Sequence, residues 1–179
     1  FYLYNKTWPG QVSLRSILPE AIDNLLVPVC LSSTHVGYGT VRVEPVWMTI
    51  GEAAAHLACE AISQNQPPAL VANDRIIRRL AERRFLLTFF NDIEKQTAAD
   101  WYPAIQYFGT KGFLPTCDAR PSAPLSRALA SLWISSALKL KRGESHDAMA
   151  MARSCAAIKE DEPGPFLTTE EFSAELVKA

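Results

Sequence analysis

The sequence predicts a mixed α and β fold that is rich in helix, with a strand–loop–helix unit near the start and an all-helical C-terminal region. Three observations support this. Residues 24–29 form a short apolar run typical of a buried strand. Residues 45–64 carry small and apolar residues at helical spacing. From residue 97 onward the chain reads as a series of helices separated by glycine- and proline-containing turns.

Composition sets broad limits on the class of protein. The chain has 179 residues, a formal net charge of -1 and 48% hydrophobic residues, which suits one globular domain or one and a half. This charge balance does not favour a nucleic-acid partner, and no apolar run approaches the roughly 20 residues of a membrane helix. The N-terminus has neither an initiator methionine nor the layout of a signal peptide, so we expect a segment of a longer protein. The compartment stays open.

The four cysteines do not indicate a metal site. They lie far apart and none forms a C-x-x-C pair, so we expect no zinc site. Their redox state is not decided by the sequence. Cys59 falls within the apolar pattern of the helix at 45–64, where a free cysteine is expected to act as a small hydrophobe.

The stretch from residue 23 to residue 62 is the part on which the functional interpretation depends. A predicted strand at 24–29 leads into a small, polar, glycine-containing loop at 30–43, and Glu44-Pro45 then opens a helix. In α/β folds such a loop and helix N-terminus together bind anions, because backbone N–H groups and the helix dipole point at the ligand. The alternative is a strand–loop–helix unit that holds no ligand.

The elements on either side complete the predicted organisation. Residues 73–84 are predicted to form an amphipathic helix with five arginines, which indicate the solvated face of the helix or, alternatively, phosphate or nucleic-acid binding. Residues 85–90, FLLTFF, are predicted as a strand, as are residues 1–4. We therefore expect two parts, 1–92 with mixed structure and 97–179 with helices only. The predicted helices of the second part surround residues 101–108, 126–140 and 144–158, and a last one begins at Thr168.

Several short motifs occur in a fixed order in the first part: Arg15-Ser16-Ile17-Leu18-Pro19, Asp23-Asn24-Leu25-Leu26-Val27, Ser33-Thr34-His35, Arg42-Val43-Glu44-Pro45 and Gly51-Glu52-Ala53-Ala54. This order resembles the last flavin-contacting segment of a family of bacterial FAD-dependent oxidoreductases, some of whose members are labelled xanthan lyase-like. The resemblance covers about the first third of the chain. It implies that this part is the C-terminal remnant of an α/β flavin-binding fold.

The resemblance also implies a set of cofactor-contacting residues. The backbone around 43–47 would meet the N1–C2 edge of the flavin, and residues 29–31 would pass its ribitol and pyrophosphate arm. The implied FAD-binding residues are Cys30, Leu31, Ser32, Ser33, Thr34, Arg42, Val43, Glu44 and Pro45. No G-x-G-x-x-G occurs in the sequence, so the nucleotide-binding half would be a missing N-terminal partner, and this chain alone would not be an active enzyme.

His35 is the candidate catalytic residue. Histidine is the side chain that titrates near neutral pH without perturbation, so His35 could transfer a proton or orient a substrate. The alternative is a histidine whose ring nitrogens hydrogen-bond the loop backbone.

A second resemblance concerns the helical part. Ala104-Ile105, Gly112-Phe113, Pro121 and Ser126-Arg127-Ala128 follow the order of an S-layer homology repeat. It implies a module that binds glycan or docks on a partner, and polysaccharide lyase activity is a further alternative. A small-molecule or glycan substrate therefore stays open.

Overall fold

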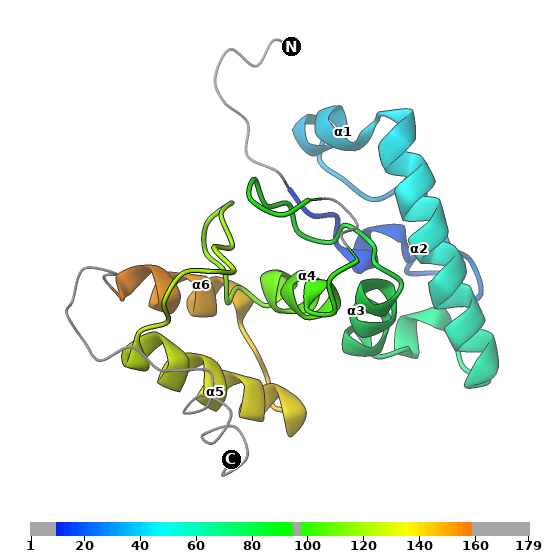
Figure 1. The fold of residues 1–179 in the computed structure, drawn as a ribbon. Helices are drawn as coiled ribbons and strands as arrows, with labels where there is room; N and C mark the ends of the chain where they lie inside the picture. Colours follow the sequence, from blue (N-terminus) through cyan, green and yellow to red (C-terminus); the bar gives the residue numbers. More distant parts are fainter. Residues whose placement is uncertain (1–9, 95–97, 159–179) are drawn as a thin grey trace. The chain divides into compact units, whose positions relative to one another are not determined.

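The computed structural model describes residues 10–94 and 98–158, and it divides the chain into two compact units, residues 1–85 and 86–179 (Figure 1). Within the described residues it contains six α-helices, two short 3-10 helices and no β-sheet. The helix-rich prediction is confirmed, and the strands predicted at 24–29 and 85–90 are wrong. The strand predicted at 1–4 and the helix predicted from Thr168 lie outside the described residues.

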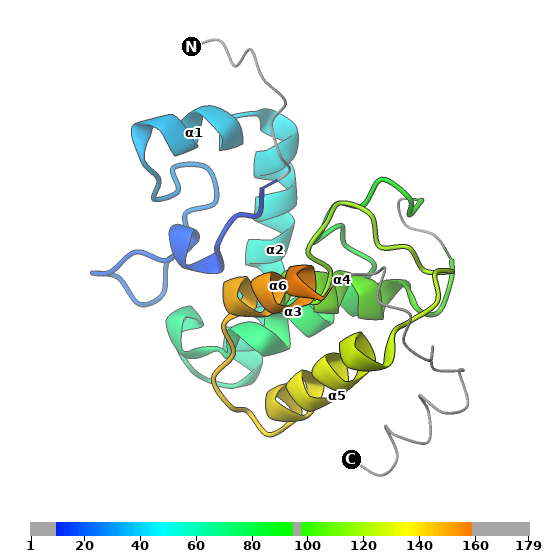
Figure 2. The same cartoon turned by 90° about the vertical axis from the view of Figure 1, so that its left-hand side faces the viewer.

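The first unit is built around one long helix. A 3-10 helix, η1 (Leu14–Ile17), is followed by α1 (His35–Val41), α2 (Glu44–Ser63), a second 3-10 helix, η2 (Pro68–Leu70), and α3 (Asn73–Glu82). Figure 2 shows α1 lying across the N-terminal end of α2. Both η2 and α3 pack against α2. The helix expected at 45–64 is confirmed, with Pro45 in its first turn, where the missing N–H costs no hydrogen bond.

Residues 24–29 do not form the strand that their apolar pattern predicts. Their segment is instead fixed beside η1, where the Val27 N–H donates to the Ile17 carbonyl at 2.9 Å and the Ser32 N–H donates to the Ser16 carbonyl at 2.7 Å. A strand needs a ladder of such bonds to a partner strand, and Pro28 has no N–H to add to one. The apolar residues pack locally: Leu26 lies against the cluster of Ile17, Leu31, Ile50 and Ala54.

The loop expected at 30–43 is also wrong in part, because residues 35–41 form α1. The helix begins where the Thr34 hydroxyl accepts a hydrogen bond from the Gly37 N–H at 3.0 Å. This cap offsets the poor helix propensity of a seven-residue segment that contains Gly37 and Gly39. Cys59, expected on the buried face of α2, is exposed, and none of the four cysteines is disulfide-bonded.

The second unit packs three helices: α4 (Tyr102–Thr110), α5 (Arg127–Lys141) and α6 (Ala148–Ala157). All three were predicted, although α6 begins at Ala148 rather than at Glu144. Phe113 and two residues of α6, Met151 and Cys155, form its central cluster. The hydrophobic residues packed against this cluster are Phe108, Leu129, Leu132, Trp133, Ala137 and Leu140.

Residues 85–90 are not a strand either, and a side chain explains why. Gln106 of α4 is 1% exposed, and its Oε1 accepts hydrogen bonds from the Leu87 N–H at 2.7 Å and the Thr88 N–H at 2.8 Å. Phe90 is buried against Ile93 and Tyr102. The amide of Gln106 thus takes the place that a neighbouring strand would fill.

Asp147 links the stability of the second unit to pH. Its Oδ1 accepts from the Met149 N–H at 2.9 Å and the Ala150 N–H at 3.1 Å, which caps α6. The bond from Ala150 is the main reason that the pKa of Asp147 lies below its ordinary value of 3.8. Because the lowered pKa favours the ionised carboxylate in the folded state, this stabilisation is present above the ordinary pKa. It is lost as the pH falls through the lowered one.

We therefore expect acidification from pH 7 to about pH 3 to destabilise the wild-type second unit more than the Asp147→Asn variant, which keeps a capping oxygen without a titrating group. Urea denaturation of both proteins at the two pH values measures this. An equal loss of stability in both proteins would contradict the assignment.

Candidate functional site

The candidate site is the exposed bend of residues 30–45, called the bend below, which carries every sequence-predicted cofactor residue. Leu31 is its one buried member and packs with Ile17, Ile50 and Ala54, so it anchors the bend to the core of the first unit. The other predicted residues are exposed on its outer side. Leu31 is therefore placed to fix the backbone, and its side chain is not available to a ligand.

The first half of the bend is held by short hydrogen bonds. The Ser33 hydroxyl donates to the Thr34 carbonyl at 3.1 Å, and the Thr34 hydroxyl is occupied by the Gly37 N–H. A Cβ on Gly37 would lie 2.8 Å from the Ser33 Oγ, so any residue other than glycine at this position would require the turn to rearrange. Among Ser32, Ser33 and Thr34, the hydroxyl of Thr34 therefore acts as a helix cap.

His35 is the first residue of α1 and is exposed. It forms no side-chain hydrogen bond with another residue in the described ranges. The alternative in which the ring nitrogens of His35 hydrogen-bond the loop backbone therefore has no support from the contacts within the described residues, and the residue is exposed.

The second half of the bend joins two helices. Arg42 is the C-cap residue of α1, and its N–H donates to the Tyr38 carbonyl at 3.0 Å. Val43 is the N-cap residue of α2 and is 50% exposed. Because Val43 has no side-chain oxygen, no side chain caps the N-terminus of this 20-residue helix. The positive end of the α2 dipole, beside the exposed Arg42, is open to an anionic group.

Two groups modify this electrostatic picture. Glu44 is exposed in the first turn of α2, where its charge interacts favourably with the helix dipole but opposes an approaching anion. Trp47, half-buried in the next turn, has an indole Nε1 that is buried without a hydrogen-bond partner among the residues described. An unmet donor of this kind is uncommon in folded proteins.

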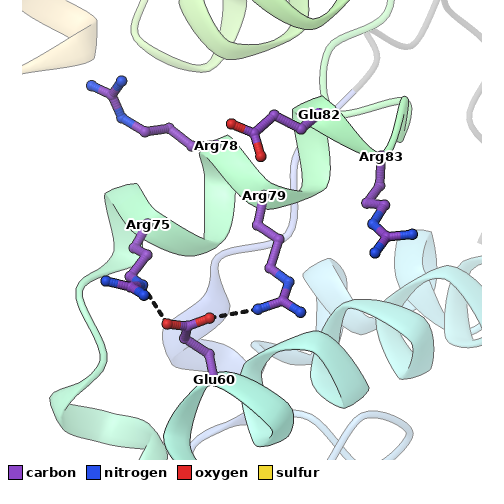
Figure 3. A pocket seen from close by; sticks show the side chains of 6 residues that line it. All are labelled: Glu60, Arg75, Arg78, Arg79, Glu82 and Arg83. Carbon is purple, nitrogen blue, oxygen red and sulfur yellow. Dashed lines mark hydrogen bonds and ion pairs between the residues drawn. The ribbon is translucent and has the colours of Figure 1, made fainter. Parts of the chain in front are cut away.

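Sequence reasoning missed a second polar cluster in the first unit. Glu60 of α2 is 2% exposed, and its carboxylate accepts a hydrogen bond from Arg79 Nη1 at 2.6 Å and is ion-paired with Arg75 Nε (Figure 3). Gln64 Nε2 donates to the same carboxylate at 2.6 Å. The bond from Gln64 is the first of the causes that set the pKa of Glu60 below 4.5, and the two arginines add to it against the opposing effect of desolvation.

One signal in the sequence could have indicated this cluster. Glu60 follows Ala54 and Leu57 on the buried face of α2, and a carboxylate in such a position requires a partner. The side chains of Arg75 and Arg79 are partly exposed, and their guanidinium groups also join α3 to α2 through Glu60.

Residues 2–83 match the model of one protein family, described as FAD dependent oxidoreductase. No curated protein and no solved structure matches the chain. The matched range contains the whole bend and α3 and ends before the second unit. The first unit is thus similar to FAD-dependent oxidoreductases. The S-layer and lyase resemblances receive no support and stay predictions.

Across residues 10–94 and 98–158, no helix is both long and apolar enough to cross a membrane. Over the same ranges, no group of three or more histidine, cysteine, aspartate or glutamate side chains is placed to hold a metal ion.

Proposed function

We propose that the bend forms one wall of an FAD site in an FAD-dependent oxidoreductase. The observation that carries the proposal is the family match over residues 2–83, within which the bend is an exposed backbone turn next to a helix N-terminus without a side-chain cap. FAD brings redox chemistry through its isoalloxazine ring, and the protein must bind it, orient it and exclude water.

The donor set of the bend fits an anionic cofactor edge. The N-terminus of α2 supplies positive potential, worth about 0.3–1 kcal/mol toward an exposed negative group and about 2 kcal/mol toward a partly buried one. The guanidinium of Arg42 is exposed at the same junction and is able to pair with a phosphate oxygen. The negative charge of Glu44 repels an anionic group, so we expect such a group to approach the N-terminus of α2 from the side of Arg42.

His35 is proposed as the group that exchanges a proton with the substrate or holds it in place. His35 is exposed at the start of α1, and histidine is a common general acid–base group in enzymes. The backbone N–H groups of the preceding Ser32 and Ser33 are on the same exposed turn, although the Ser32 N–H is already bonded to Ser16.

The wall is proposed to be half of a site. The sequence contains no G-x-G-x-x-G loop, so the phosphates of the dinucleotide require a nucleotide-binding segment from elsewhere. We expect this chain alone to bind FAD weakly, with a Kd on the order of 1 mM, because it supplies a fraction of the contacts.

The test is FAD binding to the 179-residue chain, followed by NMR. The Arg42→Gln variant is expected to bind FAD about tenfold more weakly, the equivalent of one charge-assisted hydrogen bond. Arg153→Gln provides the matched control, because Arg153 is exposed on α6 in the other unit. Equal affinities of the two variants for FAD would contradict the proposal.

A further inference from the structure

The face of α3 that meets α2 carries more positive charge than its ion pairs neutralise. Arg75, Arg79 and Arg83 point toward α2, whereas Arg78 and Glu82 lie on the other side of α3 (Figure 3). Glu60 is ion-paired with Arg75 and Arg79, and it is the carboxylate of the pocket that lies on this face. Two positive charges on this face are left without a counter-charge from the pocket.

These side chains line an open pocket of about 430 Å³, called the arginine pocket below. Its lining residues are Glu60, Arg75, Arg78, Arg79, Glu82 and Arg83. Its volume lies within the range of about 300–1,000 Å³ that small-molecule sites occupy. The pocket lies wholly within the first unit and uses no residue of the bend.

Glu60 holds two of the guanidinium groups in place. It engages Arg75 through Nε and Arg79 through one terminal nitrogen, which leaves the other N–H groups of both forks for a ligand. The side chains of Arg75 and Arg79 remain 62% and 38% exposed. Fixing them in advance lowers the entropy that a ligand would otherwise lose on binding.

Planar guanidinium groups in a fixed arrangement match the geometry of a phosphate, which they bind through paired hydrogen bonds. A phosphate monoester carries close to two negative charges at neutral pH, which equals the excess on this face. The carboxylate of Glu82, which also lines the pocket, can accept a hydrogen bond from a hydroxyl group, which favours a hydroxylated ligand. We propose that the arginine pocket binds a small hydroxylated molecule through a phosphate monoester group.

The test is a two-dimensional NMR titration of the full chain with inorganic phosphate and, separately, with glucose 6-phosphate. Sodium chloride at the same ionic strength provides the blank. Saturable shifts of the Nε–H signals of Arg75, Arg79 and Arg83 are expected with both phosphates. Shifts of the same size with chloride would overturn the proposal, and so would binding of inorganic phosphate without binding of glucose 6-phosphate.

Two variants distinguish a binding site with positioned side chains from a surface that is only positively charged. Arg83→Gln is expected to weaken the affinity for glucose 6-phosphate about tenfold, and Arg84→Gln, whose side chain does not line the pocket, by less than about twofold. Equal effects of the two variants would overturn the proposal.

Glu60→Gln provides the second comparison. It adds net positive charge but releases Arg75 and Arg79, so a positioned site predicts weaker phosphate binding and a simple charge patch predicts tighter binding. Tighter binding by this variant, with its helical circular dichroism retained, would overturn the proposal. FAD binding at the bend is expected to be unchanged in Arg83→Gln, so the failure of either proposal leaves the other testable.

Discussion

Replacing Gly112 with alanine is expected to destabilise the second unit by about 2–5 kcal/mol. Gly112 follows α4 with a φ of 78°, and a Cβ on it would lie 2.0 Å from the Ala148 carbonyl oxygen at the start of α6. The left-handed conformation costs a non-glycine residue about 1–2 kcal/mol. Displacing the backbone of α6 adds about 1–3 kcal/mol, because the atom that the new Cβ would meet belongs to the backbone and not to a flexible side chain.

Gly143 provides the matched control for this prediction. It has nearly the same φ, 73°, but no atom lies within 4 Å of the position that its Cβ would take. Gly143→Ala should therefore cost about 1–2 kcal/mol, the conformational part alone. Urea denaturation followed by hydrogen exchange of the α6 amides measures both variants, and equal destabilisation of the two would contradict the close contact between Gly112 and α6.

Replacing Gln106 with methionine is expected to destabilise the second unit by about 2–4 kcal/mol. Methionine has a similar volume, but it removes the Oε1 acceptor to which the Leu87 and Thr88 N–H groups donate. The loss of an acceptor for a buried donor costs about 1–3 kcal/mol. Because Leu87 and Thr88 are only half-buried, we expect the combined cost of their two unsatisfied N–H groups to be lower than that of two fully buried donors.

Gln106→Glu tests the cause of that effect. The carboxylate keeps an oxygen in the same place, so its Leu87 and Thr88 amides should exchange with solvent more slowly than those of Gln106→Met at pH 7. If the two variants exposed these amides equally, the side-chain acceptor would not be what holds residues 86–90 in place.

Five of the six helices in the described residues could be predicted from the sequence because each of these five carries its own local signal. Pro45 marks the start of α2, Ser126 caps α5 by accepting from the Leu129 N–H, and the apolar spacing in α5 identifies its packed face. The helix α1 was missed because its glycines give it poor propensity, and the Thr34 cap that begins it also fits a loop.

The strands predicted at 24–29 and 85–90 were wrong for a different physical reason. An apolar run indicates burial, but burial alone does not choose between a strand and an irregular segment, since a strand needs partners for its N–H and C=O groups. Gln106 supplies those partners to residues 87 and 88 from about 18 residues away. No local pattern in FLLTFF contains that information.

The candidate sites divide in the same way. The bend is contiguous in sequence, so its position and its link to α2 could be predicted, although the burial of Leu31 could not. The arginine pocket joins Glu60 to residues 15 to 23 positions later, across the packing of α2 against α3. Its assembly depends on a tertiary contact that the spacing of charges does not reveal.

Photochemical labelling tests whether the bend lies against FAD, as we propose. The full chain is irradiated with a photoreactive azido analogue of FAD, with and without excess FAD, and the labelled peptides are identified by mass spectrometry. We expect labelling within residues 30–47 that excess FAD suppresses. Labelling confined to other segments, or labelling of the bend that excess FAD leaves unchanged, would contradict it.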